Sequence, residues 1–447
     1  MKQYDVIVIG SGAAAQTVAE RVRAAGWATA IVDERPFGGT CELRGCDPKK
    51  VLMSGAEAVD LARRLHGHGV AGEIRIDWAE LMAFKRSFTE PVPERLARHF
   101  AEIGIDALQG HARFTAPDTI ALDGQTLQSR FFVIATGNAP VPLEFPGAEH
   151  VVGSDVFLDL DRLPRRLVLV GGGYIAAELS HLAARAGAEV HVLQRRDRLL
   201  PTFDSTLVGW LDEKFRAVGI DVRLRTAVER IERDGEAFAV RIKGDGGSVT
   251  LAADLVVHAA GRAPALGGLN LAGAGIETEG GRLRLNEFLQ SVSNPKVYAA
   301  GDAAAKGPPL TPVASHDGKV VAANLLEGNR HRPNYAAVPS VVFTIPPLAR
   351  VGLSETEARA QGLKFTVKSE HTGDWYSSRR LAERVSGFKV LIEEPTGFIL
   401  GAHLLGPHAD EVINLFALTM RQRLPASALK DTIFGYPTGA SDVAHMV

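Results

Sequence analysis

Cysteine is scarce in this 447-residue chain: there are only two, Cys41 and Cys46, and they lie five residues apart. A secreted scaffold that depends on disulfides would use more cysteines, spaced widely enough to close loops. One close pair in a large chain indicates thiol chemistry, although two inert buried thiols would give the same count. The scarcity therefore excludes a disulfide-stapled domain and directs attention to the segment around the pair.

Strong charge and long apolar runs are also absent. The formal net charge of −2 provides no field that would gather nucleic acid or an anionic membrane. No apolar run approaches the length needed to cross a bilayer. The strand-like run 4–9 contains Asp5 and is followed by Gly10, which argues against a signal peptide. We therefore expect a cytoplasmic protein without a nucleic-acid or membrane partner.

The bulk composition is that of a globular enzyme, with 46% hydrophobic and 23% charged residues. A chain of this length is too long for one core and predicts two to four domains. The remaining histidines, including His316 and His403, lack the spacing of metal ligands, so no metal site is expected.

A dinucleotide-binding unit opens the chain. A predicted strand over 5–9 leads into Gly10-Ser11-Gly12-Ala13-Ala14-Ala15, a helical stretch, and a second strand over 28–32 that ends at Asp33. Gly10 makes the tight turn, Gly12 lets backbone approach a pyrophosphate, and Ala15 lets helix and strand pack closely. The helix N-terminus offers free N–H groups to the phosphates. Asp33 can accept both ribose hydroxyls of an adenosine.

A second copy of this unit begins about 160 residues later. A strand over 167–170 leads into Gly171-Gly172-Gly173-Tyr174, a helix, and a strand over 189–193. The position that matches Asp33 lies 23 residues after Gly171 and is Gln194, followed by Arg195 and Arg196. An acid repels a 2′-phosphate, whereas a neutral residue beside two arginines attracts one. The second unit is therefore expected to prefer NADPH over NADH, although paired arginines are also common on surfaces.

The cysteine pair follows the first unit, in Gly38-Gly39-Thr40-Cys41-Glu42-Leu43-Arg44-Gly45-Cys46-Asp47-Pro48-Lys49-Lys50. In a regular helix two residues five apart are roughly 8–9 Å apart between Cα atoms, and a disulfide tolerates at most about 7 Å. A bridge therefore needs a distorted turn, which Gly45 and Pro48 can provide. A strained bridge beside a cofactor is reducible, and so short a loop adds little stability. The pattern favours a redox-active disulfide.

These motifs together resemble the pyridine nucleotide–disulfide oxidoreductase family, which includes glutathione reductase, dihydrolipoamide dehydrogenase and mercuric reductase. The resemblance runs over nearly the whole chain and is most specific at Gly38–Lys50. It implies an α/β fold with two Rossmann-like domains, for FAD and then NAD(P), and a C-terminal α+β dimerisation domain. The further matching segments are Ala135-Thr136-Gly137, Gly173-Tyr174-Ile175-Ala176-Ala177-Glu178, Ala260-Gly261-Arg262, Ala299-Ala300-Gly301-Asp302, Leu310-Thr311-Pro312-Val313-Ala314 and Pro339–Gly352.

The resemblance assigns roles to particular residues. Cys46 is implied to be the flavin-side thiol that becomes a charge-transfer thiolate, and Cys41 the interchange thiol that attacks the substrate. Lys50 is implied to lie beside the flavin and to pair with Glu178, since a buried lysine needs an acidic partner. Tyr174 covers the nicotinamide pocket or is simply a packed ring. The remaining implied cofactor residues are Gly39, Thr40, Thr136, Gly137, Gly261 and Asp302, the last holding the ribityl chain of FAD.

The C-terminal segment departs from the family. Disulfide-reducing members read His-Pro-Thr followed by an acid, and this segment supplies an acid–base catalyst to the partner subunit; here it reads Tyr436-Pro437-Thr438-Gly439-Ala440-Ser441-Asp442. A phenol with a pKa of about 10 is a poor base at neutral pH but can donate a proton. His445 could substitute, although a terminal histidine is most often solvated. Tyr436 is therefore the candidate catalytic residue of this segment.

Asp47 is a second departure, because an apolar residue commonly follows the flavin-side cysteine. Its charge would raise the pKa of the neighbouring thiol, or it is an exposed loop acid.

The leading hypothesis is an FAD-dependent, NADPH-oxidising homodimer that reduces a small disulfide or another thiol-reactive acceptor. A metal ion or a quinone is the alternative acceptor, although mercuric reductases carry extra C-terminal cysteines and this chain has none after Cys46. A non-catalytic redox sensor is a third reading, which the two nucleotide units, Lys50 and Glu178 argue against. The expected domains are an FAD-binding domain (1–148), an NAD(P)H-binding domain (149–280), a central segment that returns to the FAD domain (281–336) and an interface domain (337–447).

Overall fold

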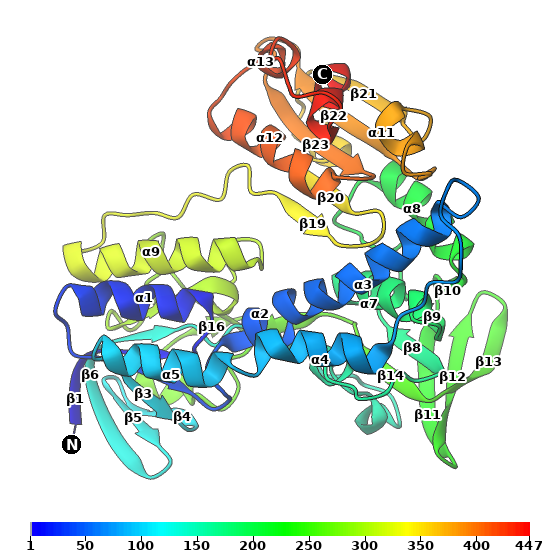
Figure 1. The fold of residues 1–447 in the computed structure, drawn as a ribbon. Helices are drawn as coiled ribbons and strands as arrows, with labels where there is room; N and C mark the ends of the chain where they lie inside the picture. Colours follow the sequence, from blue (N-terminus) through cyan, green and yellow to red (C-terminus); the bar gives the residue numbers. More distant parts are fainter. Residues whose placement is uncertain (1) are drawn as a thin grey trace. The chain divides into compact units, whose positions relative to one another are not determined.

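The computed structural model describes residues 2–447, and its N-terminal sheet is built around strand β1 (Lys2–Ile9) (Figure 1). Val6 to Ile9 of this strand are buried on both faces, as expected for a central parallel strand. Strand β1 pairs in parallel with β2 on one side and β6 on the other. The order of the sheet is β3-β2-β1-β6-β5-β4, and β18 also pairs with β6. The bounds are β2 (Thr29–Asp33), β3 (Asp106–Gln109), β4 (Ala112–Ala116), β5 (Thr119–Leu122), β6 (Gln125–Ile134) and β18 (Val297–Ala299).

Two helices from distant parts of the sequence, α1 (Ala13–Ala24) and α9 (Thr311–Glu327), lie side by side in this unit (Figure 1). Gly318 of α9 makes the approach possible, because a Cβ there would lie 2.8 Å from the Ala14 carbonyl oxygen. The unit also contains α2 (Gly39–Arg44), α5 (Val92–Glu102) and the short strand pairs β7 (Asn138–Pro140) with β15 (Arg262–Pro264) and β16 (Thr278–Glu279) with β17 (Arg282–Leu283).

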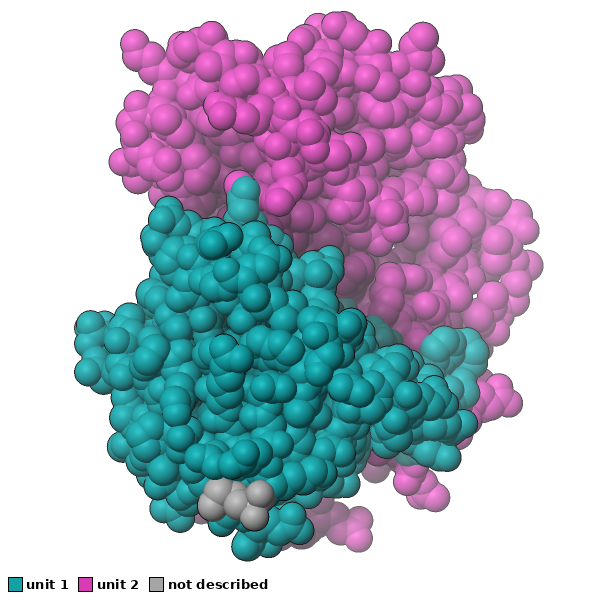
Figure 2. All heavy atoms as spheres, turned by 90° about the vertical axis from the view of Figure 1, so that its left-hand side faces the viewer, with its two compact units in different colours: residues 1–49, 84–141, 262–335 teal, residues 50–83, 142–261, 336–447 magenta. Residues whose placement is uncertain are grey.

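The chain divides into two compact units, drawn in two colours in Figure 2. The first unit comprises residues 1–49, 84–141 and 262–335, so the chain leaves it twice and returns twice. The second comprises residues 50–83, 142–261 and 336–447. Two helices run across the boundaries, α3 (Cys46–Arg64) and α4 (Trp78–Thr89).

The second unit contains a parallel sheet with the order β10-β9-β8-β14. Its strands are β8 (Arg166–Val170), β9 (Glu189–Leu193), β10 (Ile220–Arg223) and β14 (Leu255–His258). The second unit also contains the helices α6 (Ser154–Phe157), α7 (Tyr174–Arg185) and α8 (Ser205–Ala217). A separate antiparallel sheet is formed by β11 (Ala227–Asp234), β12 (Ala237–Gly244) and β13 (Gly247–Ala253).

The C-terminal part of the second unit is an antiparallel sheet with the order β19-β20-β23-β22-β21. Phe388 of this sheet and Phe416 of a covering helix are fully buried in one apolar cluster. The elements are β19 (Ser340–Val342), β20 (Leu348–Gly352), β21 (Phe365–His371), β22 (Gly387–Glu393), β23 (Ile399–Leu405), α10 (Glu355–Ala360), α11 (Tyr376–Arg379), α12 (Ala409–Arg421), α13 (Ala426–Lys430) and α14 (Val443–Met446).

A buried ion network anchors the later turns of α3. Asp60 of α3 binds Arg185 of α7 at 2.7 Å, with side chains only 7% and 1% exposed. Arg64 also binds Asp60, and Lys214 of α8 pairs with Glu383 at 2.9 Å. Removing one member would leave a buried charge without its partner, a change that typically costs 3–5 kcal/mol. The helix that begins with Cys46 is thus fixed at its far end.

The predicted fold class is confirmed, with two Rossmann-like parts and a C-terminal α+β part. The strand expected over 28–32 runs over Thr29–Asp33, so Asp33 is its last residue. The strand expected over 5–9 begins earlier, at Lys2.

Candidate functional site

Two glycines at the first glycine turn, Gly10 and Gly39, have no room for a side chain. Gly10 has a φ of +112°, and a Cβ there would lie 2.2 Å from the Ala135 carbonyl oxygen. A Cβ on Gly39 would lie 2.5 Å from the Cα of Gly12, the N-cap residue of α1. Ala15 is fully buried beneath the turn. The two glycine-rich segments therefore meet at the N-terminus of α1 and leave its first N–H groups accessible to phosphates.

The structure fixes the carboxylate of Asp33 at the end of β2. Its Oδ2 accepts a hydrogen bond from Ser11 Oγ at 2.6 Å, and its Oδ1 accepts one from the backbone N–H of Arg35 at 2.9 Å. A carboxylate has about four lone-pair sites, so Asp33 can still accept the hydroxyls of a ribose.

Unsatisfied buried atoms mark the place of a ligand in the first unit. Among the described residues, the buried side-chain oxygens Thr136 Oγ1 and Asn138 Oδ1 have no hydrogen-bond partner. Asn138 Nδ2 donates to Asp302 Oδ2 at 3.0 Å, and burial raises the pKa of Asp302 while Arg262 opposes the shift. Buried polar groups normally find partners. These atoms and the glycine cradle fit a dinucleotide such as FAD, which would supply hydroxyl groups.

A buried acid, Asp317 of α9, supports the turn that contains Asp302. It accepts hydrogen bonds from the Gly301 backbone N–H at 3.1 Å and from the Tyr335 hydroxyl at 2.8 Å. Burial raises its pKa to about 6, in spite of these two hydrogen bonds. Asp317 thereby links the cofactor turn to α9, the helix that begins with Thr311.

The second glycine turn repeats the geometry of the first. Gly171 has a φ of +122°, and a Cβ there would lie 2.1 Å from the Ala259 carbonyl oxygen. Gly173 is the N-cap residue of α7, and open space surrounds its Cα on the side where a Cβ would point. Gly261, which also has a positive φ of +119°, likewise has open space there. This turn is therefore suited to a second nucleotide.

The residue 23 positions after the first glycine of each unit, which we call the reader, is Asp33 in the first unit and Gln194 in the second. Gln194 is only 9% exposed, and its Nε2 donates to the Arg198 carbonyl oxygen at 3.1 Å within its own loop. Arg195 and Arg196 follow it and are exposed. The loop thus presents two guanidinium groups where the first unit presents a carboxylate.

The two thiols lie on either side of a break between helices. Helix α2 ends before Gly45, whose φ of −142° and ψ of −111° are not helical, and α3 begins at Cys46. A Cβ on Gly45 would lie 2.8 Å from the Thr40 carbonyl oxygen. The distorted turn expected at Gly45 is therefore present, whereas Pro48 lies in the first turn of α3, where a missing N–H is tolerated.

Thr311, the first residue of α9, contacts both sulfur atoms. Its hydroxyl donates to Cys41 Sγ at 3.1 Å and lies 3.4 Å from Cys46 Sγ. Both cysteines are free thiols. The hydroxyl holds the pair together in its reduced form.

The two thiols have opposite acidities. A hydrogen bond from Cys41 lowers the pKa of Cys46 to about 6, helped by Thr311 and Lys49 and opposed by burial and Asp47. The same hydrogen bond raises the pKa of Cys41, and burial raises it further. These directions favour a thiolate at Cys46 and a neutral thiol at Cys41. The roles that the family resemblance implies for the two thiols stay predictions.

Asp47 is directed at the other thiol rather than at its neighbour in sequence. Asp47 Oδ1 lies 3.8 Å from Cys41 Sγ and is a second acceptor for the Cys41 thiol proton, at a long distance that the large sulfur radius allows. Burial and the charge of Glu42 raise the pKa of Asp47. Asp47 is exposed, as the second alternative expected, but it belongs to the first turn of α3 and its carboxylate lies beside the Cys41 thiol.

Lys50 does not pair with Glu178 as expected. Lys50 Nζ binds Glu57 Oε1 at 2.7 Å and lies 4.7 Å from the centre of the Phe343 ring. Glu57 lies about two helical turns further along α3, within reach of the lysine. Glu178 Oε1 accepts a hydrogen bond from the backbone N–H of Phe343.

Tyr174, at the start of α7, has a packed ring. It lies 5.5 Å from the ring of Phe203 in an edge-to-face arrangement, and burial raises the pKa of its phenol. The contact is consistent with either expected role, because a ring that covers a pocket must also rest on something.

The C-terminal segment leaves Tyr436 77% exposed, stacked on Tyr376 with ring centres 6.3 Å apart. Ser441, in the position of the family's acid, forms reciprocal capping hydrogen bonds with Thr438. Asp442 accepts a hydrogen bond from Ser377, and the His445 ring rests edge-on against Trp375. Neither residue is directed at Tyr436 by these contacts.

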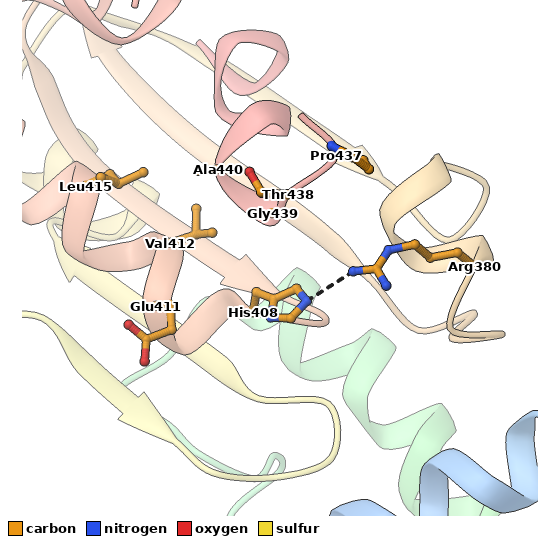
Figure 3. A pocket seen from close by; sticks show the side chains of 9 residues that line it. All are labelled: Arg380, His408, Glu411, Val412, Leu415, Pro437, Thr438, Gly439 and Ala440. Atoms are coloured by element: carbon orange, nitrogen blue, oxygen red, sulfur yellow. Dashed lines mark hydrogen bonds between the residues drawn. The ribbon is translucent and has the colours of Figure 1, made fainter. Parts of the chain in front are cut away.

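A hollow on the same face of this domain is lined by the residues that follow Tyr436 (Figure 3). Pro437 and Thr438 form one side, and the opposite side includes His408, whose Nε2 lies 3.5 Å from an Arg380 guanidinium nitrogen. Within residues 2–447, no group of three or more His, Cys, Asp or Glu side chains is arranged to hold a metal ion.

Three residues of the site were not predicted as such. Thr311 lies in a segment that matched the family motif but received no role, Asn138 follows a matched segment, and Asp317 lies six residues after Thr311. An acid in an apolar helical stretch was the available signal for Asp317. Its partners, Gly301 and Tyr335, lie too far away in sequence to be inferred from a pattern.

Comparisons with known proteins agree with this geometry. The family described as pyridine nucleotide-disulphide oxidoreductase matches residues 4–318, and its dimerisation domain matches residues 338–447. The chain belongs to this family. It is thus a flavin-dependent disulfide oxidoreductase that uses FAD and a pyridine nucleotide, and the dimerisation domain supports assembly as a homodimer.

Relatives within the pyridine nucleotide–disulphide oxidoreductase family have several activities. The chain is 33% identical to a mercuric reductase from Staphylococcus aureus over 98% of its length and 80% of that protein. It is 30% identical to a glutathione reductase from Burkholderia cepacia, over 98% and 97% of the two chains.

Among solved structures, the Cu(II) complex of the HOCl-induced flavoprotein disulfide reductase RclA from Escherichia coli is similar, with a TM-score of 0.90 and 28% identity over 100% and 99% of the chains. In the described part of this chain, no helix is both long enough and apolar enough to cross a membrane.

Proposed function

We propose that this flavoprotein is a cytoplasmic NADPH-dependent reductase that passes electrons to the Cys41–Cys46 pair and then to a small disulfide or another thiol-reactive acceptor. The observation that carries the proposal is the pair itself: two free thiols in contact with one hydroxyl, with pKa values displaced in opposite directions. We assign FAD binding to residues 1–148 and 281–336, NADPH binding to 149–280 and dimer contacts to 337–447.

The roles of the chain's own residues follow from the site. Bound FAD supplies two-electron transfer between the nicotinamide and the thiol pair. Gly10, Gly12, Asp33 and Asp302 would hold FAD, and Cys46, whose pKa is lowered, would be the thiol that takes electrons from it. Cys41 attacks the acceptor.

The nucleotide preference rests on the loop after β9. Gln194 is buried in its own loop and carries no charge, so this side chain does not repel a 2′-phosphate as an acid would. The exposed Arg195 and Arg196 can each form charge-assisted hydrogen bonds to that phosphate. We propose that Tyr174, at the start of the neighbouring helix, covers the nicotinamide pocket.

Tyr436 is proposed to donate a proton or hydrogen bond in place of the family's histidine. Its phenol cannot serve as an efficient base at neutral pH, and Ser441 is occupied in a helix cap. The C-terminal segment therefore contributes less to acid–base catalysis here than a His and Glu pair would. We expect slow turnover of oxidised glutathione relative to flavin reduction.

A metal ion is the second candidate acceptor. The specific support is the similarity to mercuric reductases and to a flavoprotein reductase solved as a Cu(II) complex. Against mercury in particular, the chain has no cysteine after Cys46 that could deliver the ion.

Acceptor turnover tests the proposal directly. NADPH consumption by the holoenzyme should be measured with oxidised glutathione, 5,5′-dithiobis(2-nitrobenzoate), a quinone, Cu(II) and Hg(II), alongside Cys41→Ser. We expect disulfide-dependent consumption that Cys41→Ser abolishes. Consumption only with Cu(II) or Hg(II) would favour the second candidate, and consumption that survives Cys41→Ser would overturn the role of the thiol pair.

The C-terminal segment is tested by restoring the family's residues. Tyr436→His together with Ser441→Glu should raise oxidised glutathione turnover, because general acid–base catalysis is typically worth about 10²–10⁴-fold. The rate of flavin reduction by NADPH, measured by stopped flow, should not change. If the unmodified enzyme already turns over oxidised glutathione as fast as its flavin is reduced, Tyr436 is not a limitation.

A further inference from the structure

We propose that Asp47 is the acid–base catalyst of the interchange thiol: its carboxylate takes the proton of Cys41 and returns it to the departing thiolate. The inference rests on the proposed disulfide-reductase function and deepens it, because it adds a proton-transfer group inside the same subunit to the weak proton donor, Tyr436, proposed for the C-terminal segment.

The geometry brings the three reacting groups together. The Thr311 hydroxyl donates its proton to Cys41 Sγ at 3.1 Å, so the proton of Cys41 must point elsewhere. Asp47 Oδ1 is an acceptor of that proton, 3.8 Å from Cys41 Sγ. The non-helical Gly45 lies between the two residues, so Cys41 and Asp47 are not held at the separation that one continuous helix would impose. Catalytic hydrogen bonds are often long before substrate binds and shorten in the complex.

The carboxylate solves a problem that the thiol pair alone cannot solve. Cys46 is the other acceptor of the Cys41 proton, but taking it would neutralise the thiolate that must later close the disulfide. Transfer to Asp47 leaves Cys46 anionic and makes Cys41 nucleophilic at the moment of attack. Asp47 therefore gives the proton a destination that preserves both functions.

The surroundings tune Asp47 for this task. Partial burial and the negative charge of Glu42 raise the pKa of Asp47, which makes it a better base. Glu42 is itself paired with Arg95 of α5 at 3.0 Å and accepts a hydrogen bond from Gln16 of α1. On the side of α3, Lys49 acts on Cys46 and favours its thiolate.

The C-terminal segment offers no comparable group. Tyr436 is exposed and stacks on Tyr376, and Ser441 caps its own helix. Asp47 contacts a reacting sulfur directly, so it is placed to perform the chemistry that the family assigns to a histidine.

In the proposed reaction, Asp47 carries one proton between sulfur atoms while the substrate disulfide breaks and the Cys41–Cys46 disulfide forms. Asp47 accepts the Cys41 proton, the Cys41 sulfur bonds to one sulfur of the substrate disulfide, and the substrate S–S bond breaks. The protonated Asp47 gives its proton to the leaving thiolate. The Cys46 thiolate then bonds to Cys41 Sγ and expels the second thiolate, which is protonated by solvent. The pair has lost two electrons and the substrate disulfide has gained two.

Asp47→Asn gives opposite results for a catalytic and a purely electrostatic carboxylate. If Asp47 only raises the thiol pKa by its charge, the variant will contain more Cys41 thiolate and will exchange faster. If Asp47 moves the proton, reoxidation of the NADPH-reduced enzyme by oxidised glutathione will slow by about 10²-fold or more. Flavin reduction should be unchanged in either case, and Asp47→Glu should restore part of the rate.

Two disulfides separate the acid role from the base role. The thiolate released from 5,5′-dithiobis(2-nitrobenzoate) is a weak base and leaves without a proton, whereas that released from glutathione is not. Asp47→Asn should therefore slow oxidised glutathione more than 5,5′-dithiobis(2-nitrobenzoate). Equal losses with the two disulfides would overturn the donor role.

The pH dependence supplies an independent readout. The rate with oxidised glutathione should rise with pH as Asp47 loses its proton, and Asp47→Asn should lack this limb. Glu42→Gln removes a negative charge and releases Arg95, so the limb should move to lower pH. Glu94→Gln, which changes an 85%-exposed acid on α5, is the matched control and should leave the profile unchanged.

The outcomes are distinguishable from failure of the proposed function. An enzyme whose flavin is reduced by NADPH but which reduces neither disulfide overturns both the disulfide-reductase function and this inference. An enzyme that reduces both disulfides, and does so at an equal or higher rate after Asp47→Asn, retains the function and overturns the role of Asp47. Flavin content and melting temperature equal to those of the unmodified protein establish that each variant is folded.

Discussion

The two dinucleotide units use the same backbone to present opposite charges. Each has a strand and a glycine with a φ above +110°, whose Cβ position would lie within 2.2 Å of a carbonyl oxygen just past the end of another strand. Each then has a second strand that leads to a reader residue 23 positions after the glycine. The first reader, Asp33, is held outward by Ser11, whereas Gln194 is folded into its own loop and is followed by two exposed arginines.

The glycine turn and the reader residue act independently of each other. The turn admits a pyrophosphate in both units because backbone geometry alone requires glycine. The reader selects the adenosine through charge, and it can change without disturbing the turn. Substitutions in the turns should therefore abolish binding, whereas substitutions in the reader should change preference.

The largest effect is expected at the turn glycines. Gly10→Ala should prevent FAD retention, because the new Cβ meets backbone atoms that cannot move aside. Gly171→Ala should keep the flavin but lose its reduction by NADPH. The ratio of flavin to protein absorbance and stopped-flow reduction measure the two effects. A Gly171→Ala protein that loses FAD while Gly10→Ala retains it would reverse our assignment of the units.

A smaller effect is expected at the reader arginines. Charge-assisted hydrogen bonds to a phosphate are each worth roughly 1.5–3 kcal/mol. Arg195→Ala with Arg196→Ala should therefore lower kcat/KM for NADPH by roughly 10²–10⁴-fold and affect NADH much less. Arg230→Ala, at an exposed ion pair of the same domain, is the control. Equal losses with the two nucleotides would rule out the NADPH preference.

The sequence alone predicts the parts of this fold that depend on local rules. Glycine at a positive φ, the reader distance and the break at Gly45 follow from spacing and backbone geometry. The partner of Lys50 could not be predicted from the sequence. Lys50 binds Glu57 on the same helix, and the choice among nearby acids depends on three-dimensional placement. The contact between Asp47 and Cys41 was also missed, because it depends on the direction that α3 takes after the break.

The smallest effect is expected at Asp317, a buried acid of α9 in the first unit. The pKa of Asp317 is raised to about 6 by burial, so the folded state binds a proton that the unfolded state has already released. The free energy of unfolding should therefore fall as pH rises from the ordinary aspartate range to about 6. Asp317→Asn should flatten this fall in thermal unfolding curves of the holoenzyme. An unchanged pH dependence would mean that Asp317 is ionised throughout.

The two thiols are proposed to have different roles, Cys46 toward the flavin and Cys41 toward the acceptor. One absorbance measurement distinguishes them. Cys46 has a lowered pKa and Cys41 a raised one, so only a Cys46 thiolate should form a charge-transfer complex with oxidised flavin. Cys41→Ser should show the long-wavelength band at pH 8 without any reductant and lose it on acidification. Cys46→Ser should show no band, even after addition of NADPH. A Cys41→Ser protein without the band, or a Cys46→Ser protein with it, would contradict the account.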